Sequence, residues 1–250
     1  MKQVAVFGDS VSKGVIYDPE LKRYVFGNGI DWKSIEERLN IKIDNHSKMG
    51  ATITYGFQKL KAYLDTNPTV DIIVLEYGGN DSDFDWAKVA EIKSNDHQSK
   101  TTIDVYKQTL IQMIQLIESK NIKPIVLTLP AIHAKRYYKW ISRLNINMKN
   151  VLYFLGDIEH IYRYHELYNL TILEVASQLN IQHIDIRKVF LDTKNNKLMI
   201  CEDGIHPTIY AEQIIVEYII NQIDFRTMQA SVVPQASKLN LAFYDKESII

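Results

Sequence analysis

The stretch Gln3–Ser10, with the sequence QVAVFGDS, predicts a buried β-strand followed directly by a tight polar turn. The strand, Gln3–Phe7, is a compact, largely apolar run. Four more short runs of this kind follow along the chain: Ile41–Asp44, Asp71–Tyr77, Pro124–Leu129 and Gln182–Ile186. Short, nearly continuous apolar runs are typical of parallel strands that are buried on both faces.

Amphipathic helices are predicted between these strands, because apolar residues recur there at helical spacing. The sets are Ile53, Phe57, Leu60 and Leu64; Ile103, Tyr106, Leu110, Met113 and Ile117; Ile161, His165, Tyr168, Ile172, Val175 and Leu179; and Ala211, Ile214, Ile215, Tyr218 and Ile219. Strands that alternate with helices imply right-handed crossovers and a parallel sheet covered on both faces. We therefore predict an α/β fold, a three-layer α/β/α sandwich with about five parallel strands.

Two segments depart from this alternation. Residues 81 to about 100 carry Asp81, Asp83 and Asp85, which alternate as in a calcium-binding loop. Trp86 stands where such a loop needs glycine and Ile92 where it needs glutamate, so we interpret the segment as a solvated acidic loop. Residues 130 to about 159 form an aromatic insertion, whose rings could serve packing or ligand recognition equally well.

Composition excludes several classes of protein. Lys plus Arg number 29 and Asp plus Glu number 30, a net charge of −1, which argues against a nucleic-acid-binding or anionic-membrane-binding protein. The apolar run at the N-terminus ends at Phe7, too short for a signal peptide or a membrane span. We therefore expect a soluble, cytoplasmic protein without integral membrane association.

Two reactive side chains are interpreted as packing residues. Cys201 is the one cysteine, so neither an intramolecular disulfide nor a cysteine-rich zinc site can form, and a small buried hydrophobe is its expected role. His165 lies on the apolar face of its predicted helix, where a packed histidine is expected more often than a ligand.

Polar residues follow the predicted strands at the edge where α/β sheets bind ligands. Ser10 follows the first strand, Gly50 the second and Asn80 the third, while Asp203 and His206 precede the last helix. A serine hydroxyl needs a base, an imidazole is suited to that role, and a carboxylate can orient the imidazole. The Ser10 and Gly50 backbone N–H groups and the Asn80 amide could stabilise an oxyanion.

Each of these motifs alone is common in caps and turns, and only the presence of all four in order indicates a catalytic site. Together they resemble the SGNH hydrolases, or GDSL-type esterases and lipases, over residues 3 to about 223. The matching blocks are Gly8-Asp9-Ser10, Gly50, Gly78-Gly79-Asn80-Asp81 and Asp203-Gly204-Ile205-His206. Val11 departs from the leucine of the family's name motif.

The resemblance implies a flavodoxin-like fold with a catalytic triad of Ser10 as nucleophile, His206 as base and Asp203 as its orienting carboxylate. Ser10, Gly50 and Asn80 would form the oxyanion hole. The implied activity is hydrolysis of acyl or acetyl esters through an acyl-enzyme, without metal or organic cofactor. The substrate would be a small ester, with acylated carbohydrate as one candidate.

Two alternatives remain open at this point. The same site could transfer the acyl group to an alcohol, or the chain could be a non-enzymatic flavodoxin-like module that binds a ligand at the Gly8–Gly14 turn. The second alternative gives Asp203 and His206 no role, and the turn lacks a phosphate-binding loop motif. The acyl length, the alcohol and the oligomeric state are not determined by these patterns.

Length leaves the number of domains open, since 250 residues correspond to about 1.7 average domains. Ser10 and His206 must meet in one site although they lie near opposite ends of the chain. We therefore predict one hydrolase domain over residues 1–224, with the aromatic insertion around 130–159, followed by a tail or arm over 225–250.

Overall fold

A five-stranded parallel sheet forms the centre of the computed structural model, which describes residues 1–223. Its strands, in the spatial order β4-β1-β5-β6-β7, are β4 (Ile41–Asn45), β1 (Lys2–Gly8), β5 (Ile72–Glu76), β6 (Lys123–Leu127) and β7 (Gln182–Ile184). Among the strands of this sheet, β1 comes first in the chain and lies between β4 and β5, the next two, which is the flavodoxin-like order. The predicted α/β class and the five parallel strands are confirmed.

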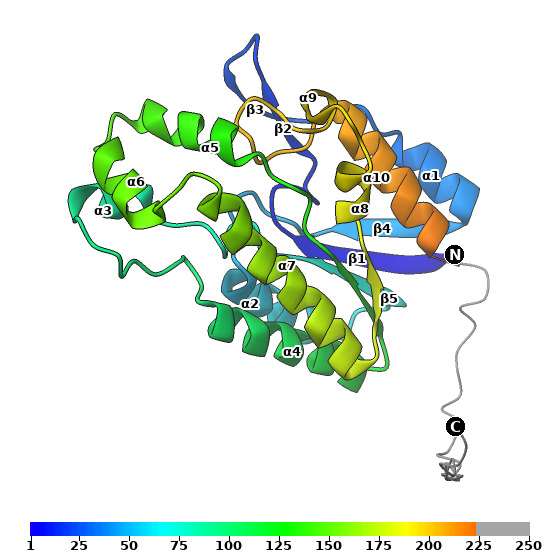
Figure 1. Cartoon of the computed structure of the whole chain (residues 1–250). Helices are drawn as coiled ribbons and strands as arrows, with labels where there is room; N and C mark the ends of the chain where they lie inside the picture. Colours follow the sequence, from blue (N-terminus) through cyan, green and yellow to red (C-terminus); the bar gives the residue numbers. More distant parts are fainter. Residues whose placement is uncertain (224–250) are drawn as a thin grey trace, which may run out of the picture.

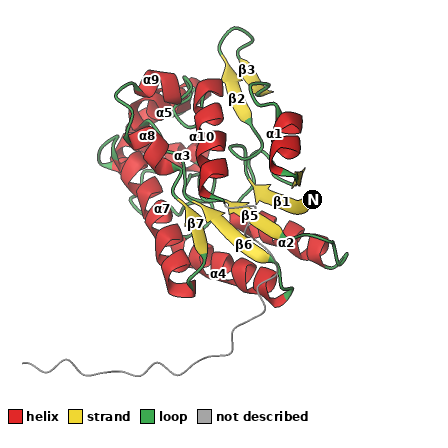
Figure 2. Cartoon of the chain, turned by 90° about the vertical axis from the view of Figure 1, so that its right-hand side faces the viewer, coloured by secondary structure: helices red, strands yellow, loops and turns green. Residues whose placement is uncertain are grey.

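Helices cover both faces of this sheet (Figures 1 and 2). The helices on one face are α2 (Ile53–Leu64), α4 (Ile103–Ser119) and α7 (His160–Leu179), and those on the other are α1 (Trp32–Leu39), α8 (Arg187–Leu191) and α10 (Ile209–Gln222). Each layer packs on the sheet through its own apolar cluster. The buried positions of α2, α4 and α7 include most of the residues that the helical periodicity places on one face.

The register of the two central strands positions the polar turns. Val4 pairs with Ile72 and Gly8 pairs with Glu76, so β1 and β5 end at the same level. The Asp9-Ser10 turn and the segment that begins at Tyr77 therefore leave the sheet side by side. This edge is the one at which the sequence predicts the site.

The aromatic insertion forms a small apolar core of its own beside that edge. Its helices are α5 (Ala134–Ile141), the 3-10 helix η1 (Ser142–Leu144) and α6 (Met148–Leu155), and they pack against α3 (Trp86–Glu91). The ring centroids of Phe84 and Phe154 lie 4.9 Å apart, nearly perpendicular. Packing is thus one role of the insertion, and Tyr137 also lines the pocket described below.

The interpretation of residues 81 to 100 as a solvated acidic loop is wrong for two of its three aspartates. Asp81 is fully buried, and its carboxylate accepts the Ile53 backbone N–H at 3.0 and 3.1 Å, at the start of α2. Asp83 accepts hydrogen bonds from the Trp86 indole and the Tyr137 hydroxyl, both at 2.8 Å. Only Asp85 is exposed, and it caps α3.

The remaining elements were not predicted from the sequence. An antiparallel hairpin, β2 (Val15–Asp18) and β3 (Arg23–Phe26), follows the Ser10 turn, and the one-turn helix α9 (Asn196–Met199) precedes Asp203. The predicted tail, residues 225–250, lies outside the described residues, and the division at residue 224 stays a prediction. None of the described helices combines the length and apolarity that crossing a bilayer requires.

We expect Leu60→Ala to destabilise the fold strongly, because the Leu60 side chain is fully enclosed between α2 and the sheet. A Leu→Ala change at such a position costs about 3 kcal/mol through lost burial and the cavity left behind. The free energy of unfolding in urea measures the effect. Leu167→Ala, on the exposed side of α7, is the control and should change it by less than about 1 kcal/mol.

Candidate active site

A pocket of about 200 Å³ opens at the carboxyl ends of the central strands. Four of the residues predicted for the site line it: Ser10, Gly50, Asn80 and His206. Asp203 lies behind His206 and is fully buried. The remaining walls are mainly apolar and aromatic, with Tyr24, Met49, Phe84, Trp86, Leu129, Tyr137 and Ile161 among the lining residues.

Ser10, His206 and Asp203 form a continuous chain of hydrogen bonds. The Ser10 Oγ lies 2.9 Å from the His206 Nε2, and the His206 Nδ1 lies 2.5 Å from the Asp203 Oδ2. The backbone N–H groups of Ile205 and His206 also donate to Asp203 Oδ1, at 3.1 and 3.2 Å. Residues 196 positions apart in the sequence are thus in direct contact.

The charge of Asp203 determines the tautomer of His206. Burial acts to raise the pKa of Asp203, but the hydrogen bonds it accepts and the neighbouring imidazole outweigh burial, so the pKa lies below its usual value. An ionised carboxylate only accepts, so Nδ1 carries the proton. The lone pair of Nε2 therefore faces the Ser10 hydroxyl.

The loop that carries Asp203 and His206 is held against the aromatic insertion by Gly204. This residue has a left-handed φ of +83°, and a Cβ here would lie 2.5 Å from the Tyr137 backbone nitrogen. The Gly204 carbonyl accepts the His133 N–H at 2.7 Å. A glycine is therefore required for this close approach.

Three hydrogen-bond donors lie beside Ser10. The backbone N–H groups of Ser10 and Gly50 donate to no other described residue, so both are free to bind a ligand oxygen. Gly50 has a left-handed φ of +76°. The Asn80 amide donates one hydrogen to Asp9 Oδ2 at 3.0 Å, which orients the amide and leaves its second hydrogen free.

A pair of buried carboxyl groups, Asp9 and Glu76, lies beneath these donors. Burial raises the pKa of both, and the nearby Asp9 charge raises that of Glu76 further. Asp9 accepts hydrogen bonds from the Val11 N–H and the Asn80 amide, while Glu76 Oε1 has no partner as a carboxylate. Glu76 therefore holds the proton, and its hydroxyl can donate to Asp9.

Several pocket residues were missed by the sequence analysis. Tyr24, from the unpredicted hairpin, packs its ring 5.0 Å from that of His206, and burial together with the Asp203 charge raises the pKa of its hydroxyl. Trp86 and Tyr137 are donors to the same Asp83 oxygen. No periodic signal separates Arg23–Phe26 from a loop, and nothing local places Tyr24 against a histidine.

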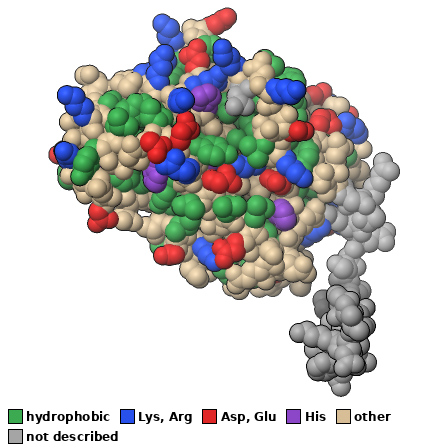
Figure 3. Space-filling model, in the orientation of Figure 1, with side chains coloured by type: hydrophobic (Ala, Val, Ile, Leu, Met, Phe, Trp, Pro, Cys, Tyr) green, Lys and Arg blue, Asp and Glu red, His purple; other side chains and the backbone are tan. Residues whose placement is uncertain are grey.

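The described residues contain no group of three or more His, Cys, Asp or Glu side chains arranged to hold a metal ion. Cys201 is buried, and its Sγ lies 3.1 Å from the Pro207 carbonyl oxygen. On the face shown in Figure 3, acidic and basic side chains are interspersed, in keeping with a net charge of −1.

A family model described as GDSL-like lipase/acylhydrolase matches residues 6–214, most of the chain. The chain belongs to this family. The predicted resemblance to the SGNH hydrolases is therefore confirmed, and with it the assignment as an esterase-type hydrolase. No individually curated protein matches the chain.

Several solved structures share the fold at low sequence identity. A lipase/acylhydrolase from Enterococcus faecalis is 20% identical with a TM-score of 0.59, covering 89% of this chain and 95% of its own. A lipolytic protein from Veillonella parvula is 15% identical (TM-score 0.59; 90% and 100% covered). An acetylxylan esterase from Geobacillus stearothermophilus is 16% identical (TM-score 0.58; 90% and 95% covered).

The proton held by Glu76 predicts a pH dependence of stability. A carboxyl whose pKa is raised in the folded state stabilises the protein below its unfolded pKa, and that stabilisation is lost as pH rises through the folded pKa. We expect Glu76→Gln, which stays neutral, to lose less unfolding free energy than the wild type between pH 5 and pH 8. Urea unfolding at both pH values measures this.

The control for this experiment is Glu217→Gln, on the exposed face of α10, which should follow the wild type. An equal loss of stability in Glu76→Gln and the wild type would contradict a protonated Glu76. The other buried carboxyls outside the Asp9–Glu76 pair are present and unaltered in both proteins, so the difference reports on the titration of this pair.

Proposed function

We propose that the protein hydrolyses small, uncharged carboxylic esters through a Ser10–His206–Asp203 triad and an acyl-enzyme intermediate. The observation that carries the proposal is the hydrogen-bonded chain from Asp203 through His206 to Ser10 Oγ, which ends in a pocket beside three donors. A serine hydroxyl with an oriented base is the arrangement that acyl transfer requires.

In the first half-reaction, Ser10 Oγ attacks the ester carbonyl carbon while His206 Nε2 takes the hydroxyl proton. Asp203 stabilises the imidazolium that forms. The negative charge on the carbonyl oxygen is stabilised by the N–H groups of Ser10 and Gly50 and by the Asn80 amide. The tetrahedral species then expels the alcohol, which takes its proton from His206, and the acyl group remains on Ser10.

In the second half-reaction, water replaces the alcohol. His206 Nε2 takes a proton from the water as its oxygen attacks the acyl carbon, and the same three donors stabilise the oxyanion. Collapse releases the carboxylic acid and returns the proton to Ser10. An acceptor alcohol in place of water would give acyl transfer, so products from a mixed water and alcohol assay separate the two activities.

The size and lining of the pocket favour a substrate that has a short acyl group and no charge. Its volume of about 200 Å³ is small, and its walls are mainly apolar. Besides the buried pair Asp9 and Glu76, Asp83 is the one carboxylate of the described residues that lines the pocket. It already accepts hydrogen bonds from Trp86, Tyr137 and Lys100. Aromatic walls also suit a sugar ring, and the structural neighbour from Geobacillus stearothermophilus is an acetylxylan esterase, so acetylated carbohydrate is our proposed substrate class.

Ser10→Ala should abolish ester hydrolysis, because no other group in the triad can form the acyl-enzyme. We expect a fluorophosphonate probe to label the wild type at Ser10, and short 4-nitrophenyl esters to be hydrolysed only while Ser10 is present. Ser82→Ala is the matched control, since Ser82 lines the same pocket but donates to the Gly79 carbonyl. Unchanged hydrolysis by Ser10→Ala would overturn the proposal.

Asn80→Ala should lower kcat/KM by a factor of about 10²–10³, or about 3 kcal/mol, if the Asn80 amide stabilises the oxyanion. KM for a 4-nitrophenyl ester should change much less than kcat, because the interaction strengthens in the transition state. Asn150→Ala is the control, since its amide binds the Ala90 carbonyl. A tenfold or smaller loss of kcat/KM would remove Asn80 from the oxyanion hole.

A further inference from the structure

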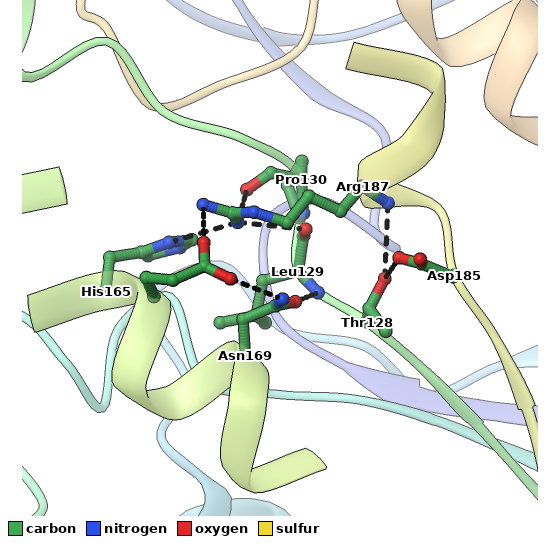
Figure 4. A network of polar contacts seen from close by, with 8 residues as sticks. Thr128, Leu129, Pro130, His165, Asn169, Asp185 and Arg187 are labelled. Carbon is green, nitrogen blue, oxygen red and sulfur yellow. Dashed lines mark hydrogen bonds and ion pairs between the residues drawn. The ribbon is translucent and has the colours of Figure 1, made fainter. Parts of the chain in front are cut away.

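A second histidine, His165, lines the same pocket as Ser10 and has no role in the proposed mechanism. It lies on α7, one turn after Ile161, and only 5% of the residue is exposed. From the sequence we interpret it as a core histidine on an apolar face. In the structure its neighbour is a buried guanidinium, that of Arg187 (Figure 4).

Arg187 is held behind the imidazole by a polar network that joins β6, α7 and α8. Its Nη1 donates to the Leu129 and Pro130 carbonyls at 3.4 and 3.3 Å, and its guanidinium forms an ion pair with Glu166. The Asn169 amide donates to Glu166 Oε1 at 3.1 Å and accepts the Leu129 N–H at 3.1 Å. The guanidinium position is therefore fixed, and its charge is balanced.

Burial, together with the neighbouring guanidinium, keeps His165 neutral. Burial, and then the Arg187 charge, lower the pKa of this imidazole to about 3, so it is neutral at physiological pH. Its Nδ1 lies 3.5 Å from Arg187 Nη1. Nη1 has two hydrogens, which it shares among this ring nitrogen and the two carbonyls. Because an arginine can only donate, Nδ1 faces it with its lone pair and the single ring proton is on Nε2.

The Nε2–H group is available to a ligand. It makes no hydrogen bond with any described residue. Nε2 is also not one of the fully buried side-chain atoms without a partner, so it keeps some accessible surface. Since His165 lines the pocket, this donor is open to it. Leu129, Ile161 and Ile132, which line the pocket together with His165, have apolar side chains that offer no acceptor.

We propose that His165 determines substrate specificity by donating a hydrogen bond from Nε2 to an uncharged acceptor oxygen of the bound ester. This inference rests on the proposed esterase function and narrows its substrate class. The preferred ester carries an ether, hydroxyl or ring oxygen in the part that enters the pocket, as carbohydrate esters do. A purely hydrocarbon group would leave a buried donor unpaired, which costs binding energy.

Isosteric ester pairs test the proposal, because each pair differs by one methylene replaced by oxygen. For the acyl side the pair is 4-nitrophenyl butyrate and 4-nitrophenyl methoxyacetate, and for the alcohol side butyl acetate and 2-methoxyethyl acetate. The ratio of kcat/KM within a pair is compared between variants, so the intrinsic reactivity of each ester cancels.

His165→Leu should lower the oxygen-to-methylene ratio of at least one pair about tenfold relative to the wild type. His165→Gln should restore most of that ratio, because its amide oxygen can accept from Arg187 while its nitrogen donates into the pocket. Ile161→Val is the matched control, since it alters the same wall without a polar group and should leave both ratios unchanged.

Equal ratios in the wild type and His165→Leu for both pairs, with ester hydrolysis intact, would overturn the inference and leave the proposed function standing. Absence of hydrolysis and of Ser10 labelling in the wild type would instead overturn the proposed function. Nitrogen-15 NMR of the imidazole gives an answer independent of turnover. We expect a neutral ring protonated on Nε2 from pH 5 to 8, and a charged or Nδ1-protonated ring would overturn the inference.

Discussion

The pairing of β1 with β5 is the constraint on which the site depends. Because the strands are parallel and Gly8 lies opposite Glu76, the turn that carries Ser10 and the segment that carries Asn80 leave the sheet together. The contact is then fixed by side chains, since the Asn80 amide donates to Asp9, next to Ser10. A shift of one residue in this register would displace the Ser10 turn along the sheet relative to the segment that carries Asn80 and would separate the two groups.

Burial of several carboxyl groups at one sheet edge is an energetic cost of this arrangement. Asp9, Glu76, Asp81 and Asp203 are all almost fully enclosed, and burial acts to raise the pKa of each. What differs is the number of donors each one meets. Asp203 accepts from an imidazole and two backbone N–H groups and stays ionised, whereas Glu76 faces another carboxyl and keeps a proton.

The sequence was sufficient to predict those parts of the molecule that depend on local pattern. Apolar runs such as Gln3–Phe7 and the helical spacing from Ile103 to Ile117 identify strands and helices, and parallel strand order places Ser10, Asn80 and His206 at one edge. The four motifs could be found because each follows its own strand. Their contacts agree with the predicted arrangement.

What could not be predicted depends on contacts between distant segments. The four-residue strands of the β2–β3 hairpin have no periodic signal that separates them from a loop, yet they bring Tyr24 to His206. Asp81 looks solvated in the sequence because its partner, the start of α2, is 28 positions away. The sequence suggests an apolar environment for His165 because the other residues on that face of its helix are apolar, whereas Arg187 reaches it from another helix.

The two histidines of the pocket show how one side chain can be given opposite chemistry. Behind His206 lies a carboxylate, which holds the proton on Nδ1 and leaves Nε2 as an acceptor toward Ser10. Behind His165 lies a guanidinium, which favours a lone pair on the facing Nδ1 and therefore a proton on Nε2. The charge at the far nitrogen therefore decides what each ring presents to a ligand: a proton acceptor at the reacting bond, and a fixed donor for recognition elsewhere in the pocket.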